Sequence, residues 1–270
     1  MSTTGYALRL SDDELARYRM MAVRAREREA DLWDLAGLRP GARAVDVGCG
    51  PGAVLTLLAE AVAPAGRVVG VDADAEAVAT ARAGLDAAGA AGAEVRQARA
   101  EATGLPAGTF DVAVLRHVLA HNGGGEQAIV DHLARLVRPG GHVYLLDVDA
   151  LSASVAPAPP DADDLVERYR RWHADQGNDL RVGRRLATLA RAAGLEVREF
   201  RGWFEIGPVP PGVRGPAWAA REALVAAGLA GPDDLARWEA AHATMDGWEP
   251  RPEYMLATFA CVARVPSLST

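Results

Sequence analysis

Apolar and polar residues follow two periods along the chain, and the changes of period mark the expected helices and strands. From residue 12 to residue 37, apolar residues recur three or four positions apart, as on a helix with one buried face. The preceding SDDE at residues 11–14 has the form of a capping box, which favours a helix start there. A short apolar run at residues 44–47 follows a Pro-Gly turn and predicts a buried strand. The pattern therefore predicts an N-terminal helical arm, at residues 1–39, followed by a core that begins with a strand.

Short apolar runs and helical periods then alternate through the middle of the chain. Helices are expected at residues 53–62, 75–89 and 126–137, and strands between or after them at residues 66–74, 93–101, 110–121 and 138–149. Strands that alternate with helices form a parallel sheet with right-handed crossovers, covered by helices on both faces. The core is therefore predicted to be a doubly wound, Rossmann-like α/β fold.

A proline-rich break at residues 157–160 ends this alternation. The remaining pattern predicts helices at residues 164–177, 182–194, 217–228 and 233–247, and strands at residues 196–206 and 254–265. We expect a sheet of seven strands, mostly parallel with an antiparallel last strand. Residues 40–206 and 251–266 would form the core, and residues 207–250 a helical lid insertion.

Composition narrows the class of protein. Half of the residues are hydrophobic, so 270 residues can bury a sizeable core. All 29 basic residues are arginine and the net charge is −7, which argues against a nucleic-acid binder. The sequence shows neither a long uncharged apolar run nor a secretory signal, so we expect a cytoplasmic protein without a membrane span. Two cysteines, Cys49 and Cys261, lack the spacing of a metal site and are expected to be reduced thiols.

The most informative stretch is VDVGCGPG at residues 45–52. Gly48, Gly50 and Gly52 follow the first predicted strand and precede a helix, an arrangement that favours close approach of a ligand to the backbone. Gly48, Gly50 and Ala53 also fit the dinucleotide fingerprint, with Asp72 about 20 residues on as a ribose-binding acid. Spacing alone leaves the two kinds of cofactor nearly tied.

Asp46 distinguishes the two kinds of cofactor by charge. A carboxylate at the end of the first strand would repel a pyrophosphate, whereas it would attract a cationic ammonium or sulfonium group. The negative charge therefore favours S-adenosylmethionine over a nicotinamide dinucleotide.

On these residues the sequence resembles the class I S-adenosylmethionine-dependent methyltransferases, whose first motif has the form D-x-G-x-G-x-G. The resemblance spans residues 43–149 and implies a methyl-transferring enzyme with S-adenosylmethionine as cofactor and no metal. It implies that the loop holding Cys49 carries the cofactor, that Asp72 binds the ribose hydroxyls and that Ala73 stacks on adenine. Glu101 and Ala102 would face the adenine amino group, although aspartate is commoner at the first of these positions.

In the family, the residues at the end of the fourth strand face the transferable methyl group. In this chain the end of the fourth predicted strand reads LRHVLAHN. Arg116 and His117 would lie at the edge of the cofactor by position. The Pro-Pro-Tyr segment of many nucleobase and amide methyltransferases is missing there, which favours a small-molecule acceptor. Tyr18 of the arm either belongs to the core or covers the methionine end of the cofactor.

No residue is singled out as a base by the sequence. Methyl transfer depends mainly on alignment in a dry pocket, and a base is needed only for some acceptors. The candidates are His117, His121 and His173, each with surface or boundary positions as the alternative reading. The segment WHADQGNDLR gathers polar groups around His173, but its acidic and amide residues could equally cap the next helix. Five large aromatic residues supply either a lid core or an acceptor pocket, namely Trp203, Phe204, Trp218, Trp238 and Trp248.

The function expected from the sequence is therefore methyl transfer from S-adenosylmethionine to a small organic molecule, by a monomer or homodimer. Two other classes stay open. One is a nicotinamide-dependent oxidoreductase, and the other is a protein that binds S-adenosylmethionine without methylating anything. A nucleic-acid methyltransferase would need a basic groove that the net charge does not suggest.

Overall fold

A computed structural model describes residues 12–267 of the chain. Its centre is a seven-stranded sheet with the strand order β3-β2-β1-β4-β5-β7-β6. The strands are β1 (Arg43–Val47), β2 (Arg67–Asp72), β3 (Ala93–Gln97), β4 (Phe110–Arg116), β5 (Val137–Ala156), β6 (Glu196–Pro208) and β7 (Glu253–Arg264). Only β7 runs antiparallel to its neighbours β5 and β6. The predicted doubly wound sheet with an antiparallel last strand is confirmed.

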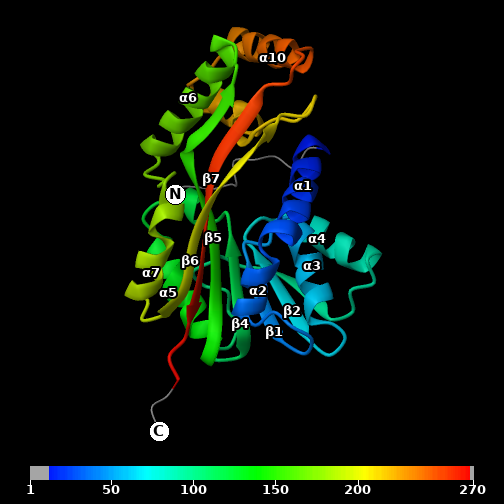
Figure 1. The fold of residues 1–270 in the computed structure, drawn as a ribbon, viewed down its shortest axis with the longest axis vertical. Coiled ribbons are helices and arrows are strands. Elements are labelled where there is room, and N and C mark those ends of the chain that lie inside the picture. Colours follow the sequence, from blue (N-terminus) through cyan, green and yellow to red (C-terminus); the bar gives the residue numbers. More distant parts are fainter. Residues whose placement is uncertain (1–11, 268–270) are drawn as a thin grey trace.

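Helices cover both faces of the sheet and continue above it. They are α1 (Asp12–Arg28), α2 (Ala30–Ala36), α3 (Ala53–Val62), α4 (Ala75–Ala87), α5 (Glu126–Leu136), α6 (Pro160–Asp175), α7 (Leu186–Ala192), α8 (Pro216–Ala219), α9 (Arg221–Ala226) and α10 (Pro232–Asp246), with 3-10 turns η1 (Leu119–His121) and η2 (Val182–Arg185). In Figure 1, α2, α3 and α4 lie on one side of the sheet, and α5 and α7 on the other.

Two apolar cores fill the spaces between sheet and helices. Leu55 and Leu58 of α3 and Trp33 of α2 pack on one face, while Leu133 of α5 and Leu189 of α7 pack on the other. The apolar run of β1, which is buried at every position after its first residue, follows from this burial on both sides.

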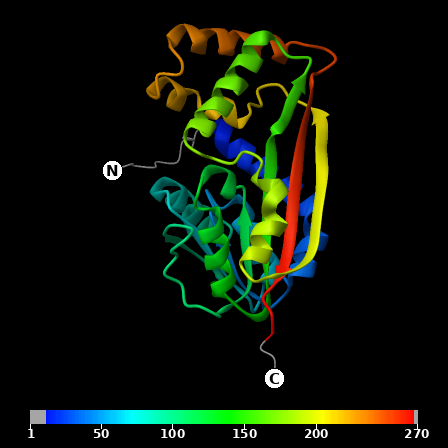
Figure 2. The ribbon, with the colours of Figure 1, turned by 90° about the vertical axis from the view of Figure 1, so that its left-hand side faces the viewer.

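Above the sheet, α6, α8, α9 and α10 form a third layer with an apolar core of its own, which includes Leu165, Leu224 and Trp238. Figure 2 shows this layer at the end of the long strands β5, β6 and β7, which extend past the rest of the sheet. The expected strand at residues 138–149 is thus longer than predicted. After a register shift beyond Asp149, β5 pairs again with β7 up to Ala156. The extended strands carry the upper helices at a distance from the glycine loop.

The expected arm helix is divided in the structure. It breaks at Glu29 into α1 and α2, and the predicted capping serine, Ser11, lies outside the described residues. The expected helix at residues 217–228 is likewise divided into α8 and α9. None of the helices within residues 12–267 is both long and apolar enough to cross a membrane.

Candidate active site

The site lies where β1 and β4 are neighbours in the middle of the sheet. From β1 the chain continues to β2 on one side, and from β4 it continues to β5 on the other. Loops that leave adjacent parallel strands in opposite directions open a crevice at the carboxyl ends of those strands. The glycine loop follows β1, Arg116 is the last residue of β4, and His117 follows it. Both predicted motifs therefore meet at this crevice.

All three motif glycines have a left-handed backbone. Their φ angles are +75° at Gly48, +53° at Gly50 and +84° at Gly52. A Cβ at Gly48 would lie 2.2 Å from Val118 Cγ2, and one at Gly52 would lie 2.9 Å from Ala81 Cβ. Two of the glycines are thus required by packing of the protein itself, whereas Gly50 faces a more open space.

Tyr18 of α1 lies over that open position. Its ring would be 3.4 Å from a Cβ built at Gly50. Both residues line the same cavity. The structure therefore places the tyrosine against the glycine loop and outside the sheet cores.

Hydrogen bonds that it donates to β2 fix the glycine loop. Gly48 N and Cys49 N donate to Val71 O at 2.7 and 3.1 Å, and Gly50 N donates to Asp72 Oδ2 at 2.8 Å. Asp74 N donates to the other oxygen of Asp72 at 3.0 Å. A carboxylate oxygen has a second lone pair, so Asp72 can still accept hydrogen bonds from a ligand in the cavity.

Asp46 is the most unusual charge in the crevice. It is 3% exposed, lines the cavity and accepts no hydrogen bond from any residue between 12 and 267. Burial raises the pKa of this carboxyl to about 7, although the nearby Arg116 guanidinium acts in the opposite direction. A buried carboxylate without a partner is costly, and a cationic ligand group would compensate it.

Arg116 is already paired with a carboxylate of the protein itself. Its Nε and Nη2 donate to Glu29 Oε2 and Oε1 at 2.9 and 2.6 Å, and Tyr144 Oη donates to Glu29 Oε2 at 2.8 Å. Glu29 is the residue at which α1 and α2 separate, and it is 3% exposed. Arg116 lines the cavity. The sequence analysis missed Glu29, because a glutamate at the end of the charged run RARERE reads as part of a solvated helix face.

The residues expected around adenine come after β2 and β3. Ala73 and Glu101 line the cavity. Glu101 accepts a hydrogen bond from Arg99. Ala102 is exposed and does not line the cavity.

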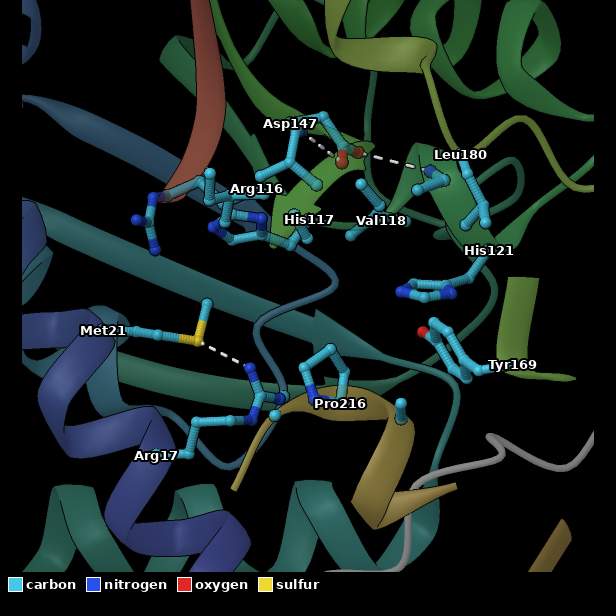
Figure 3. A pocket seen from close by; sticks show the side chains of 18 of the residues that line it. Arg17, Met21, Arg116, His117, Val118, His121, Asp147, Tyr169, Leu180 and Pro216 are labelled. Carbon is cyan, nitrogen blue, oxygen red and sulfur yellow. Dashed lines mark hydrogen bonds between the residues drawn. The ribbon is translucent and has the colours of Figure 1, made fainter. Parts of the chain in front are cut away.

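The three candidate histidines come together on one wall. Figure 3 shows His117 and His121 facing the cavity beside Tyr169, with Arg17, Met21 and Pro216 opposite. The rings of His121 and His173 are 5.1 Å apart. Burial lowers the pKa of His121 and of His173 to about 4, and that of His117 well below its usual value. All three imidazoles are therefore neutral near pH 7.

His117 has a further peculiarity. Its φ of +56° makes it the one non-glycine residue with a left-handed backbone between residues 12 and 267. Such a conformation costs about 1–3 kcal/mol and is concentrated at functional sites. The strain turns the chain sharply out of β4 and directs the imidazole into the crevice.

Asp147 of β5 is a site residue that the sequence did not reveal. It is 1% exposed, and its carboxylate accepts hydrogen bonds from Leu119 N at 3.0 Å, Ala120 N at 3.3 Å and Val148 N at 2.9 Å. These bonds hold the 3-10 turn that carries His121. Burial raises the pKa of Asp147 to about 7. In the sequence this aspartate is merely the end of an apolar run.

The cavity has a volume of about 2040 Å³ and reaches from Asp72 to Met245 of the upper layer. Pockets for one ligand measure roughly 300–1,000 Å³, so this space can hold a cofactor and a second molecule. The structure also separates the five aromatic residues. Trp203 and Trp218 line the cavity, Trp238 is buried in the upper core, Phe204 is exposed, and Trp248 packs beside α6 and α10.

Comparison with known proteins adds independent findings. A family model described as a methyltransferase domain matches residues 15–199. The chain is 34% identical over 198 residues to nocamycin O-methyltransferase of Saccharothrix syringae, covering 73% of this chain and 62% of that protein. It is 37% identical over 175 residues to an uncharacterized 37.1 kDa transposon protein of Streptomyces fradiae, covering 64% of this chain and 49% of that protein. The matches thus span about half to two thirds of these relatives.

Among solved structures, a putative methyltransferase from Bacillus halodurans superposes with a TM-score of 0.59 at 19% identity. The match covers 89% of this chain and 100% of the other. At that identity it bears on the fold, and it agrees with the seven-stranded arrangement.

Proposed function

This chain belongs to the methyltransferase domain family, and from that premise we propose that it transfers the methyl group of S-adenosylmethionine to a small organic molecule. The family match supports the predicted enzyme class and cofactor, and it gives no support to a nicotinamide-dependent oxidoreductase. The observation that carries the proposal is Asp46, the buried carboxylate without a protein partner among residues 12–267, in the cavity wall.

The residues around the crevice fit such a cofactor. We assign the cationic methionine end to Asp46, beside the backbone of Gly48, Cys49 and Gly50, with Tyr18 above it. The ribose hydroxyls would bind the free lone pairs of Asp72. Ala73 and Glu101 would flank the adenine, and Arg116 would act mainly by holding Glu29. Ala102 is left out because it lies away from the cavity.

For methyl transfer, the protein has mainly to align the acceptor with the methyl group. The cofactor supplies a methyl group on a positively charged sulfur. The arm and the lid at residues 207–250 exclude water and hold the acceptor in line, and alignment of this kind can contribute about 7–11 kcal/mol to rate acceleration. Neutral His117 and His121, which face the cavity (Figure 3), would take a proton from an acceptor of sufficient acidity.

The proposal also covers the cellular location, the acceptor class and the oligomeric state of the enzyme. Cys49 and Cys261 are both buried free thiols, which supports a cytoplasmic protein, and its charge supports a small-molecule acceptor over nucleic acid. A monomer or homodimer is proposed, and light scattering after gel filtration would distinguish the two.

A methyl-transfer assay tests the function. Purified protein is incubated with S-adenosylmethionine and a panel of hydroxylated, carbonyl-bearing and amino compounds, and S-adenosylhomocysteine and methylated products are measured by mass spectrometry. We expect turnover with at least one oxygenated acceptor. Binding of cofactor without any turnover over a broad panel would instead support the non-methylating alternative.

Asp72→Asn tests the cofactor assignment. Hydrogen bonds to a charged group are worth about 1.5–3 kcal/mol, so we expect roughly 10- to 100-fold weaker cofactor binding. Asp86→Asn, on the exposed side of α4, is the matched control and should bind like the wild type. Equal affinity of both variants would refute the role of Asp72.

A further inference from the structure

His173 lies near the end of α6, where three rings surround it. It is 3% exposed, and its ring centroid is 4.4 Å from that of Tyr169, 4.9 Å from Trp172 and 5.1 Å from His121. It lines the cavity, and it forms no ion pair with a residue between 12 and 267. Its hydrogen bonds therefore decide its chemistry.

Asn178 determines which nitrogen of His173 carries the proton. Gly123 N lies 3.0 Å from Asn178 Oδ1, and because a backbone N–H can only donate, the amide oxygen must face it. The amide nitrogen then faces His173 Nδ1 at 2.8 Å. An amide NH₂ also only donates, so Nδ1 is the acceptor and has no proton. The neutral ring must carry its proton on Nε2.

The surrounding backbone leaves the amide little freedom. Asn178 N donates to His173 O at 3.0 Å, which fixes the turn after α6. A Cβ at Gly123 would lie 2.1 Å from Gly177 O, so the loop after η1 and this turn are in close contact. The orientation of Asn178 is therefore set by two segments that are far apart in sequence.

His173 lines the cavity, so its second ring nitrogen, Nε2, is the one available to a ligand. His173 Nε2 has no hydrogen-bond partner among residues 12–267, yet it is not one of the polar atoms that packing closes off completely. Burial lowers the pKa of His173 to about 4, and a proton on Nδ1 would also oppose the amide hydrogens of Asn178. The imidazole thus presents an N–H to the cavity throughout the neutral pH range.

We propose that His173 donates a hydrogen bond from Nε2 to an oxygen of the methyl acceptor, and that Asn178 and Gly123 fix the tautomer that makes this possible. The acceptor class is then a molecule with a carbonyl or similar oxygen near the methylated group. This rests on the proposed function. It also removes His173 from the candidate bases, which leaves His117 and His121.

The tautomer is measured directly by NMR of the full chain labelled with ¹⁵N-histidine. In the wild type we expect His173 to show a protonated Nε2 and an unprotonated Nδ1, unchanged from pH 5.5 to pH 8. In Asn178→Asp the carboxylate accepts where the amide donated, so Nδ1 should become protonated. The signals of His132, His142 and His242 should stay unchanged and report that the variant is folded. A protonated Nδ1 in the wild type, or titration near pH 6.5, overturns the inference.

Acceptor recognition is tested with a matched pair of probes, 2′-hydroxyacetophenone and 2-ethylphenol, which differ only in that a carbonyl of the first replaces a methylene of the second. We expect the ketone to shift the His173 Nε2–H signal and to bind about fivefold tighter, as one neutral hydrogen bond allows. Asn178→Asp should abolish that preference. Absence of any shift with either probe, or an equal shift with both, overturns the recognition step.

The two proposals fail separately. Methyl transfer by a protein whose His173 carries its proton on Nδ1 would keep the function and overturn this inference. The expected tautomer in a protein without methyl transfer would contradict the proposed function instead.

Discussion

Gly48 and Gly52 illustrate what a motif reveals and what it hides. Their spacing after an apolar run was sufficient to predict a loop between strand and helix. Their partners, Val118 and Ala81, belong to other elements and carry no signal in the local sequence. A ligand alone therefore does not account for the glycines, because two of the three are already required by the packing of the fold.

Gly48→Ala should destabilise the protein. The new Cβ would lie 2.2 Å from Val118 at a φ of +75°, so strain and overpacking together should cost about 2–5 kcal/mol. Thermal unfolding of the variant would show this as a lower Tm. Gly84→Ala, at an exposed position inside α4 with nothing within 4 Å of its Cβ, should leave Tm equal or higher. Equal stability of the two variants would contradict the packing argument.

Asp46 makes the stability of the cofactor-free protein depend on pH. Burial raises its pKa from 3.8 to about 7, so folding favours the protonated acid. The associated stability is complete below pH 4 and is lost as the pH rises through 7. An asparagine at this position would not titrate, so Asp46→Asn should gain stability over the wild type between pH 5 and pH 8, by at most about 4 kcal/mol.

Urea unfolding of both proteins at several pH values measures this difference. Asp147 titrates in the same range in both proteins, so its effect cancels. A difference that is constant from pH 5 to pH 8 would show that Asp46 is not the buried acid described here.

At the scale of elements, the N-terminal arm shows a helix break that the apolar periodicity did not predict. The helical period of residues 12–37 predicted one continuous helix, but the chain breaks at Glu29 and turns this carboxylate inward to Arg116 and Tyr144. Nothing in the local sequence distinguishes Glu29 from its exposed neighbours Glu27 and Arg28. Its position is decided by an arginine that lies 87 residues later in the chain.

Glu29→Ala should be strongly destabilising, because it leaves the buried Arg116 guanidinium without the carboxylate that accepts both of its hydrogen bonds. Removal of one partner of a buried pair costs about 3–5 kcal/mol. Asp31→Ala breaks an ion pair with Arg201 whose side chains are 62% and 42% exposed, and should cost at most about 1 kcal/mol. Denaturant titration of both variants measures the contrast. Similar losses in the two would argue against a buried network.

At the scale of the molecule, the alternation of strands and helices was enough to predict the sheet and its winding. The cavity could not be predicted in the same way, since its walls come from parts distant in sequence. Tyr18 of the arm covers Gly50, and Arg24 of the same helix pairs with Glu205 of β6 at 3.0 Å. The register shift in β5 that carries the upper layer away from the crevice also left no pattern in the sequence.

The central claim is that a lone buried carboxylate at the end of β1 selects a cationic cofactor. Isothermal titration calorimetry of the wild type and Asp46→Asn, with S-adenosylmethionine and with NADH, tests it most directly. The account predicts one S-adenosylmethionine per chain, no heat with NADH, and clearly weaker S-adenosylmethionine binding by the variant. Tight NADH binding, or equal affinity of both proteins for S-adenosylmethionine, would contradict it.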